Sequence, residues 1–233
     1  MERWKLDLKH EGLKDLHDSF LFSVENVLTY YLACTAFDQH TVFVVNDPAS
    51  MELRASDDFP DGYTSKRSLQ DIDNLRKTGE FANLVRSHCI FSLITAFVDF
   101  FEDVRSLLNI PPEVVKPHRQ VKLYNGTIYK VRPGSLKIAH YINDEYGLLG
   151  HMTDIHTTTY IDNFISLRHM YVHNRGRFSE DYRDFVVNRW KKLKAGDRIV
   201  FGPNDFDDVL HFLVMNISGF VLSLDKKLNE LVP

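Results

Sequence analysis

One stretch decides the fold: residues Ser68 to Asn109 read SLQDIDNLRKTGEFANLVRSHCIFSLITAFVDFFEDVRSLLN. It contains no proline, and its apolar residues recur at steps of three and four, which places them on one broad face of a helix. Gly79 interrupts the pattern, so the stretch predicts one long helix or two helices with a break near Gly79. Pro111 and Pro112 end it, because proline cannot donate the helical hydrogen bond.

Four other segments predict helices. The spacing of apolar residues predicts a long first helix over Leu13 to Phe37 and another helix from Gly134 to about Tyr146. The segment from Thr153 to Asn174 predicts a helix that stops just past His173, before a glycine suited to a left-handed turn. A final helix is expected over residues 205–231, since its first residues supply side-chain oxygens to cap the free amide groups.

The intervening segments carry turn residues. Residues 38–65 contain several Asp, Pro and Gly residues, which predict a loop with at most one short strand at residues 41–45. Residues 121–131 alternate around Asn125-Gly126 and predict a small β-hairpin, and residues 198–201 have a short β-like pattern. The fold class is therefore mainly α: one helical bundle domain over residues 1–233, with loop or hairpin insertions at about 38–65 and 110–133.

The composition is that of an ordinary globular protein. Of 233 residues 44% are hydrophobic, and 28 Lys and Arg against 32 Asp and Glu give a net charge of −4. The two cysteines, Cys34 and Cys89, fall in apolar stretches, which excludes a disulfide scaffold. The chain starts without a signal-peptide pattern, and the most apolar stretch, residues 209–224, is short and contains His211 and Asn216. We therefore expect a cytoplasmic protein that makes no membrane contact.

Positive charge is concentrated between Arg168 and Arg198. This segment holds nine basic and four acidic residues, although the whole chain is negative. Aromatic residues are interleaved with the cations. Such a surface attracts a polyanion and can stack nucleic-acid bases, although a solvated connector has the same composition.

Within that region Arg168-His169-Met170-Tyr171-Val172-His173-Asn174-Arg175-Gly176 pairs a permanent cation with an imidazole five residues later. Cleavage of RNA without a metal needs a base for the 2′-hydroxyl proton, an acid for the leaving 5′-oxygen and positive donors for the phosphorane. Histidine can move either proton near neutral pH, and the arginine fork matches phosphate oxygens. Five residues at roughly 100° each put Arg168 and His173 about 140° apart around a straight helix. The spacing therefore favours a site completed by a second copy of the chain.

The pattern from Arg168 to His173, continued by Asn174 and Gly176, resembles the RxxxxH signature of the HEPN superfamily. The resemblance implies a helical bundle and a metal-independent endoribonuclease, of a toxin–antitoxin or defence system, that forms its active site by dimerisation and leaves a 2′,3′-cyclic phosphate. It makes Arg168 and His173 the catalytic pair and His169 the polar residue that follows the arginine. The nine residues that carry it end an amphipathic helix in a helical chain.

The same hypothesis assigns supporting roles. Tyr171, Asn174, Arg175 and Arg177, together with His169, would position the substrate or the imidazole, and Glu102 would be a polar partner of the site. The implied partners are RNA, a second copy of the chain, and an antitoxin or other protein; no cofactor or metal is expected. One HEPN subgroup carries a tyrosine two positions after the histidine, where this chain has Arg175. That departure speaks against neutralisation by a nucleotidyltransferase antitoxin.

Three alternatives stay open. Arg168 could pair with Asp162 or Glu102 while His173 and Asn174 cap the helix, which would make the motif structural. A catalytically inactive interaction protein could use the final helix, residues 209–224, to bind a partner or a second copy. Histidines could instead hold a metal, as four of them cluster in sequence with Asp154: His151, His156, His169 and His173.

Overall fold

The computed structural model describes residues 4–40, 69–115, 119–122, 128–148, 152, 154–185 and 190–231. The chain is mainly helical, which confirms the predicted fold class. The short strand predicted at residues 41–45 and the Asn125-Gly126 turn lie outside the described residues.

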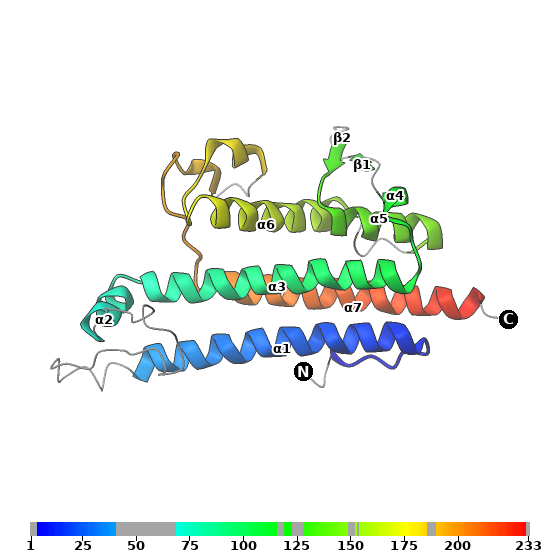
Figure 1. Cartoon of the computed structure of the whole chain (residues 1–233), viewed down its shortest axis with the longest axis horizontal. Coiled ribbons are helices and arrows are strands. Elements are labelled where there is room, and N and C mark those ends of the chain that lie inside the picture. Colours follow the sequence, from blue (N-terminus) through cyan, green and yellow to red (C-terminus); the bar gives the residue numbers. More distant parts are fainter. Residues whose placement is uncertain are drawn as a thin grey trace, which may run out of the picture.

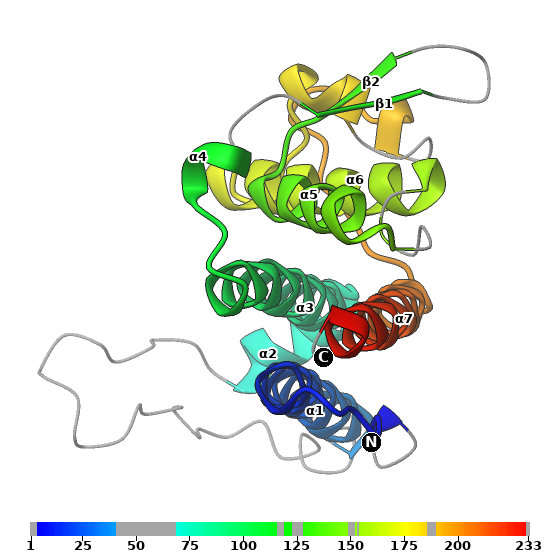
Figure 2. The ribbon, with the colours of Figure 1, turned by 90° about the vertical axis from the view of Figure 1, so that its right-hand side faces the viewer.

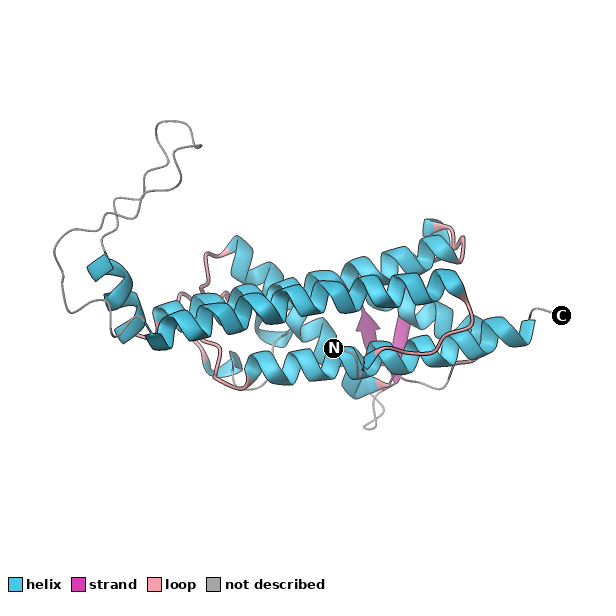
Figure 3. Ribbon diagram, turned by 90° about the horizontal axis from the view of Figure 1, so that it is seen from below, coloured by secondary structure: helices cyan, strands magenta, loops and turns pink. Residues whose placement is uncertain are grey.

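Three long helices form an elongated bundle. They are α1 (Glu11–His40), α3 (Glu80–Leu107) and α7 (Asp205–Leu231), and short α2 (Leu69–Lys77) precedes α3. Figure 1 shows α1 at the bottom with α3 and α7 side by side above it, and Figure 2 shows the same three helices end-on. Seen from the α1 side, the helices run along the long axis of the molecule (Figure 3).

The bundle is held by aromatic packing. The ring of Phe101 on α3 lies 4.9 Å from that of Phe97 and 5.1 Å from that of Phe220 on α7, and Phe100 lies 5.6 Å from Phe20 on α1. All five rings are buried. Because aromatic residues bury the largest apolar areas, this cluster is a main source of the stability of the three-helix layer.

A second layer covers α3 and α7 on the side opposite α1 (Figure 2). It consists of α4 (Pro112–Val115), α5 (Gly134–Tyr146), α6 (Ile155–His173), and the 3-10 helices η3 (Glu180–Phe185) and η4 (Trp190–Lys192). Strands β1 (Arg119–Lys122) and β2 (Ile128–Val131) pair antiparallel, with Arg119 opposite Val131. The segment predicted as a basic connector therefore contains two 3-10 turns, and only Arg198 of the predicted 198–201 strand forms a bridge, to Arg177.

Helix boundaries agree closely with the sequence pattern. The break between α2 and α3 falls at Gly79, whose φ of 73° is left-handed. Helix α5 ends at Gly147, also left-handed, and α7 spans the predicted residues. Helix α1 extends three residues beyond its predicted end, into the segment expected to be a loop.

The prediction of a cytoplasmic chain without membrane contact is wrong. Stretches of α1, α3 and α7 are each long and apolar enough to cross a membrane by length and composition. The prediction required about 20 consecutive uncharged residues for a membrane-spanning helix. A helix with enough apolar residues can span a membrane although it contains a charged residue such as Glu25. In α1 only 17% of the apolar stretch is buried in the protein, and Phe22, Leu32 and Phe37 are more than half exposed.

Candidate functional site

The motif occupies the last two turns of α6. Asp154 caps the start of this helix, accepting hydrogen bonds from the backbone N–H groups of His156 (2.9 Å) and Thr157 (3.0 Å). Ile161, Phe164, Leu167 and Met170 bury one face against the layer below. In the last two turns of α6 this packing leaves His169, Val172 and His173 exposed and Arg168 half-buried.

The turn after α6 is left-handed at two positions. Arg175 has a φ of 54° and Gly176 a φ of 76°. The Gly176 N–H donates to the Tyr171 carbonyl at 2.8 Å, which closes the helix end. A Cβ atom at Gly176 would lie 3.1 Å from the Tyr171 ring, so glycine is required by both the backbone and the close approach.

We expect Gly176→Ala to destabilise the chain more than Gly196→Ala. Both glycines have positive φ, which costs an alanine about 1–2 kcal/mol. A Cβ atom at Gly196 would have nothing within 4 Å, whereas one at Gly176 would face the Tyr171 ring. Urea unfolding of the two variants measures the difference, and equal losses would contradict the role of the ring contact.

Arg168, His169 and His173 lie on the solvent side of α6. His169 and His173 are exposed and Arg168 is half-buried. The two imidazole rings are neighbours, with centroids 4.2 Å apart. Among the residues that the structure describes, Arg168 and His173 have neither a hydrogen-bond nor an ion-pair partner on a side chain. The guanidinium is therefore available for an anion from solution.

The structural alternative for Arg168 required a carboxylate partner. The Asp162 carboxylate instead accepts hydrogen bonds from Tyr129, from Arg132 at 3.2 Å and from Ser166 at 3.2 Å. Glu102 pairs with Arg105 at 2.9 Å. Neither acid binds Arg168, so the motif does not have the pairing that would make it purely structural.

Glu102 lies away from the motif in the structure. Together with Arg105 and Lys137 it lines a cavity of about 260 Å³ where α3 meets α4 and α5. Tyr171 of the motif contacts Phe91, which precedes Glu102 by eleven residues on α3. At 1.5 Å per residue this is roughly 16 Å along the helix. Within one chain, Glu102 therefore does not lie beside the motif residue Tyr171.

The other residues that the sequence assigned to the site have different surroundings in the structure. Tyr171 is a packing residue, because its ring lies 5.0 Å from that of Phe91 and 6.2 Å from that of Phe201. Arg177 donates to the Gly196 carbonyl at 2.9 Å and holds the loop that follows. Asn174 ends α6 through its backbone N–H, and Arg175 is exposed beside it.

Asn83 on α3 was missed by the sequence reasoning. It is buried; its amide nitrogen donates to the Ile199 carbonyl at 3.1 Å and its amide oxygen accepts from Phe201 N–H at 2.8 Å. The Ile199 N–H in turn donates to the Gly176 carbonyl at 2.9 Å. Asn83 thus fixes the segment that supports the motif turn. Its only sequence signal is a polar residue on an otherwise apolar helix face.

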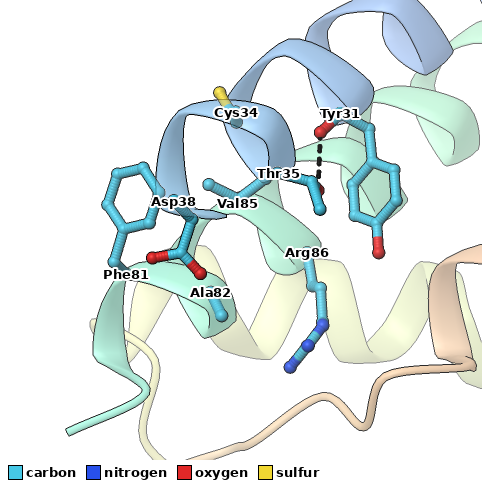
Figure 4. Close-up of a pocket in the computed structure, with 8 residues that line it drawn as sticks. All are labelled: Tyr31, Cys34, Thr35, Asp38, Phe81, Ala82, Val85 and Arg86. Carbon is cyan, nitrogen blue, oxygen red and sulfur yellow. Dashed lines mark hydrogen bonds between the residues drawn. The ribbon is translucent and has the colours of Figure 1, made fainter. Parts of the chain in front are cut away.

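A separate cavity lies where the end of α1 meets the start of α3 (Figure 4). Its volume is about 60 Å³, which holds a few water molecules and not a nucleotide. Arg86 lines it and donates to the Phe201 carbonyl at 3.3 Å. No residue of the motif lines this cavity, so it is not part of the candidate site.

The metal alternative gains no geometric support. In the described parts of the chain, no three His, Cys, Asp or Glu side chains come together in a group that could hold a metal ion. His169 and His173 remain an isolated pair there. His151 lies outside the described residues.

Comparison with protein-family models, with curated proteins and with solved structures finds no match to this chain. Its function is therefore inferred from its own residues.

Proposed function

We propose that the chain is a metal-independent endoribonuclease of the HEPN type, with Arg168 and His173 at its reaction centre. One observation carries the proposal. Both side chains stand on the solvent side of α6, and Arg168 has no acidic partner among the described residues. An arginine that is already paired would bind a phosphate only at the cost of that pair.

In this reaction one imidazole takes the proton of the 2′-hydroxyl, and the 2′-oxygen attacks the phosphorus. The bond to the 5′-oxygen breaks, and that oxygen takes a proton from an acid. The Arg168 guanidinium stabilises the phosphorane through charged hydrogen bonds. The products are a 2′,3′-cyclic phosphate and a 5′-hydroxyl end.

The proposal includes a homodimer. Arg168 and His173 flank Val172 on the outer face of α6, and Val172 is 63% exposed. Since the two side chains diverge around the helix, Arg168 of one copy acts together with His173 of a second copy, and the dimer completes the site. The resemblance extends the proposal to a toxin–antitoxin or defence role with a partner protein.

Cleavage of single-stranded RNA in the presence of EDTA tests this function. We expect cleavage that resists EDTA and leaves 2′,3′-cyclic phosphate ends, which acid treatment opens to monophosphates. Complete loss of cleavage on EDTA addition, or products with 5′-phosphate ends, would refute the proposed chemistry.

A second candidate is an interaction protein without catalytic activity. Exposed apolar side chains on α1, namely Phe22, Tyr30, Leu32 and Phe37, favour it, since exposed apolar area on one helix is typical of contact surfaces. Helix α7, which its sequence suggested for that role, buries most of its apolar residues in the bundle and exposes Met215 and Leu222. An RNA-inactive chain that binds another protein or a membrane through α1 would support this candidate.

A further inference from the structure

A row of rings extends from the motif toward the neighbouring turn. The His173 ring lies 4.2 Å from that of His169, and the His169 ring lies 6.0 Å from that of Tyr182 on η3. Both histidines are exposed and Tyr182 is half-buried. Three neighbouring rings at a surface provide flat faces on which nucleobases stack.

Tyr182 is held in place by its own turn. Its N–H donates to the Ser179 carbonyl at 3.2 Å. The next residue, Arg183, binds Glu180 through two hydrogen bonds of 2.6 Å and donates to the Leu193 carbonyl at 2.8 Å and to the Lys191 carbonyl. These bonds join η3 to η4. Both turns lie in the yellow-to-gold segment above α6 in Figure 1. These bonds keep the backbone that carries Tyr182 in place, so ordering that backbone adds little to the entropy cost of stacking a base on the ring.

The chain after Tyr182 carries exposed lysines. Lys191 and Lys192 of η4 are exposed, and in the described part of the chain neither side chain has an acidic partner. In the turn of Tyr182 itself, Glu180 is paired with Arg183 and Asp181 is exposed. Arg168 and Arg175 supply further positive charge on the motif side. Arg183 joins the turn of Tyr182 to η4, so the rings and these lysines belong to one packed unit that combines stacking faces with cations.

We propose that Tyr182, with His169, forms a nucleobase-binding subsite next to the reaction centre, and that Lys191 and Lys192 bind the phosphates of the same strand. This inference rests on the proposed function, and it adds that the RNA substrate is single-stranded where it contacts Tyr182. The strand must be single, because a base that stacks on Tyr182 has left any duplex. Binding by this subsite is sequence-tolerant, since every base has a π-face.

Binding of a short fluorescein-labelled single-stranded RNA of mixed sequence, followed by anisotropy in a His173→Ala background, tests the subsite. We expect Tyr182→Phe to bind normally and Tyr182→Leu to bind about tenfold more weakly, because leucine keeps the apolar packing but lacks the ring. A duplex of the same sequence should show no difference between these two variants. In the active background, Tyr182→Leu should raise KM more than it lowers kcat.

Salt dependence tests the lysines. Lys191→Ala with Lys192→Ala should reduce the slope of log affinity against log salt by about 1.4, since each contact to a single-strand phosphate contributes about 0.7. The control is Lys14→Ala with Lys226→Ala, two exposed lysines on α1 and α7, which should leave the slope unchanged. Thermal unfolding of each variant confirms that η3 and η4 stay folded.

The outcomes separate this inference from the proposed function. A wild-type chain that does not cleave, while Tyr182→Leu loses binding, would reject the ribonuclease and keep the subsite. Cleavage by the wild type with equal binding by the leucine and phenylalanine variants would overturn the subsite alone. Absence of any RNA binding would overturn both.

Discussion

We expect His173→Ala to lower the rate of the proposed RNA cleavage by about 10²- to 10⁴-fold and to leave the chain folded. The rate falls because positioned acid or base groups contribute factors of this size. Stability is kept because His173 is exposed, and substitutions at such positions change it by less than about 0.5 kcal/mol. Initial rates on a labelled RNA with EDTA, together with urea unfolding, measure both effects.

Arg168→Ala should lower the rate by about 10²- to 10³-fold, the usual loss when a charge-stabilising donor is removed. His156→Ala is the matched control for the histidine, because His156 is exposed at the other end of the same helix. Its rate should equal that of the wild type. EDTA-resistant cleavage that survives both motif substitutions would reject the assignment of Arg168 and His173.

Mixing the two inactive variants tests the shared site. If each reaction centre takes Arg168 from one copy and His173 from the other, mixed dimers contain one intact pair and cleavage partly returns. If both residues must come from the same copy, the mixture stays inactive. The second result would contradict the geometric inference that the two side chains diverge too far to cooperate within one chain.

Asp162→Ala destabilises the chain by about 3 kcal/mol, the largest stability loss that we predict. Asp162 is 1% exposed, and its carboxylate accepts hydrogen bonds from Tyr129 on β2, Arg132 and Ser166. Alanine removes a buried carboxylate and takes the acceptor away from the half-buried Tyr129 hydroxyl. Asp99→Ala, at an exposed position on α3, is the control and should change stability by less than about 0.5 kcal/mol. Equal urea midpoints for the two variants would contradict a structural role for Asp162.

The hydrogen bond between Tyr129 and Asp162 predicts a change in the stability of the chain at alkaline pH. Burial, and then the adjacent Asp162 carboxylate, raise the pKa of Tyr129 above its ordinary value near 10. The folded state therefore favours the neutral phenol. Its contribution to stability is complete below about pH 10 and is lost as the pH rises through the raised pKa. Tyr129→Phe, compared with the wild type in urea at several pH values, should lose stability less steeply above pH 10.

Helix positions were predictable because they depend on local sequence. The spacing of apolar residues in 68–109 and the glycine at position 79 specify two helices with a break, and the structure has that break. The end of α6 was equally predictable, since a left-handed turn after His173 needs Gly176. The membrane-length helices were missed because the sequence was searched for unbroken uncharged runs.

The site was only partly predictable. The motif itself is local, so Arg168, His169 and His173 could be found from their spacing alone. The separation of Glu102 from the motif within the chain was not predictable, because helix membership says nothing about position along α3 relative to α6. Asn83 was missed, because it acts through contacts with residues distant in the sequence. Tyr182 was predicted only as one of several aromatic residues in the basic segment, because its contact with His169 depends on a separate turn.

The sequence by itself determined where the helices lie and which short motif carries a cation and an imidazole. Both depend on residues within a few turns of each other, whose geometry is set by the helical repeat. Tertiary structure decided that Asp162 is satisfied by Tyr129 and Arg132 rather than by Arg168, and that α6 lies in a layer on the side of α3 and α7 opposite α1. Those facts come from packing between layers, which no local pattern encodes.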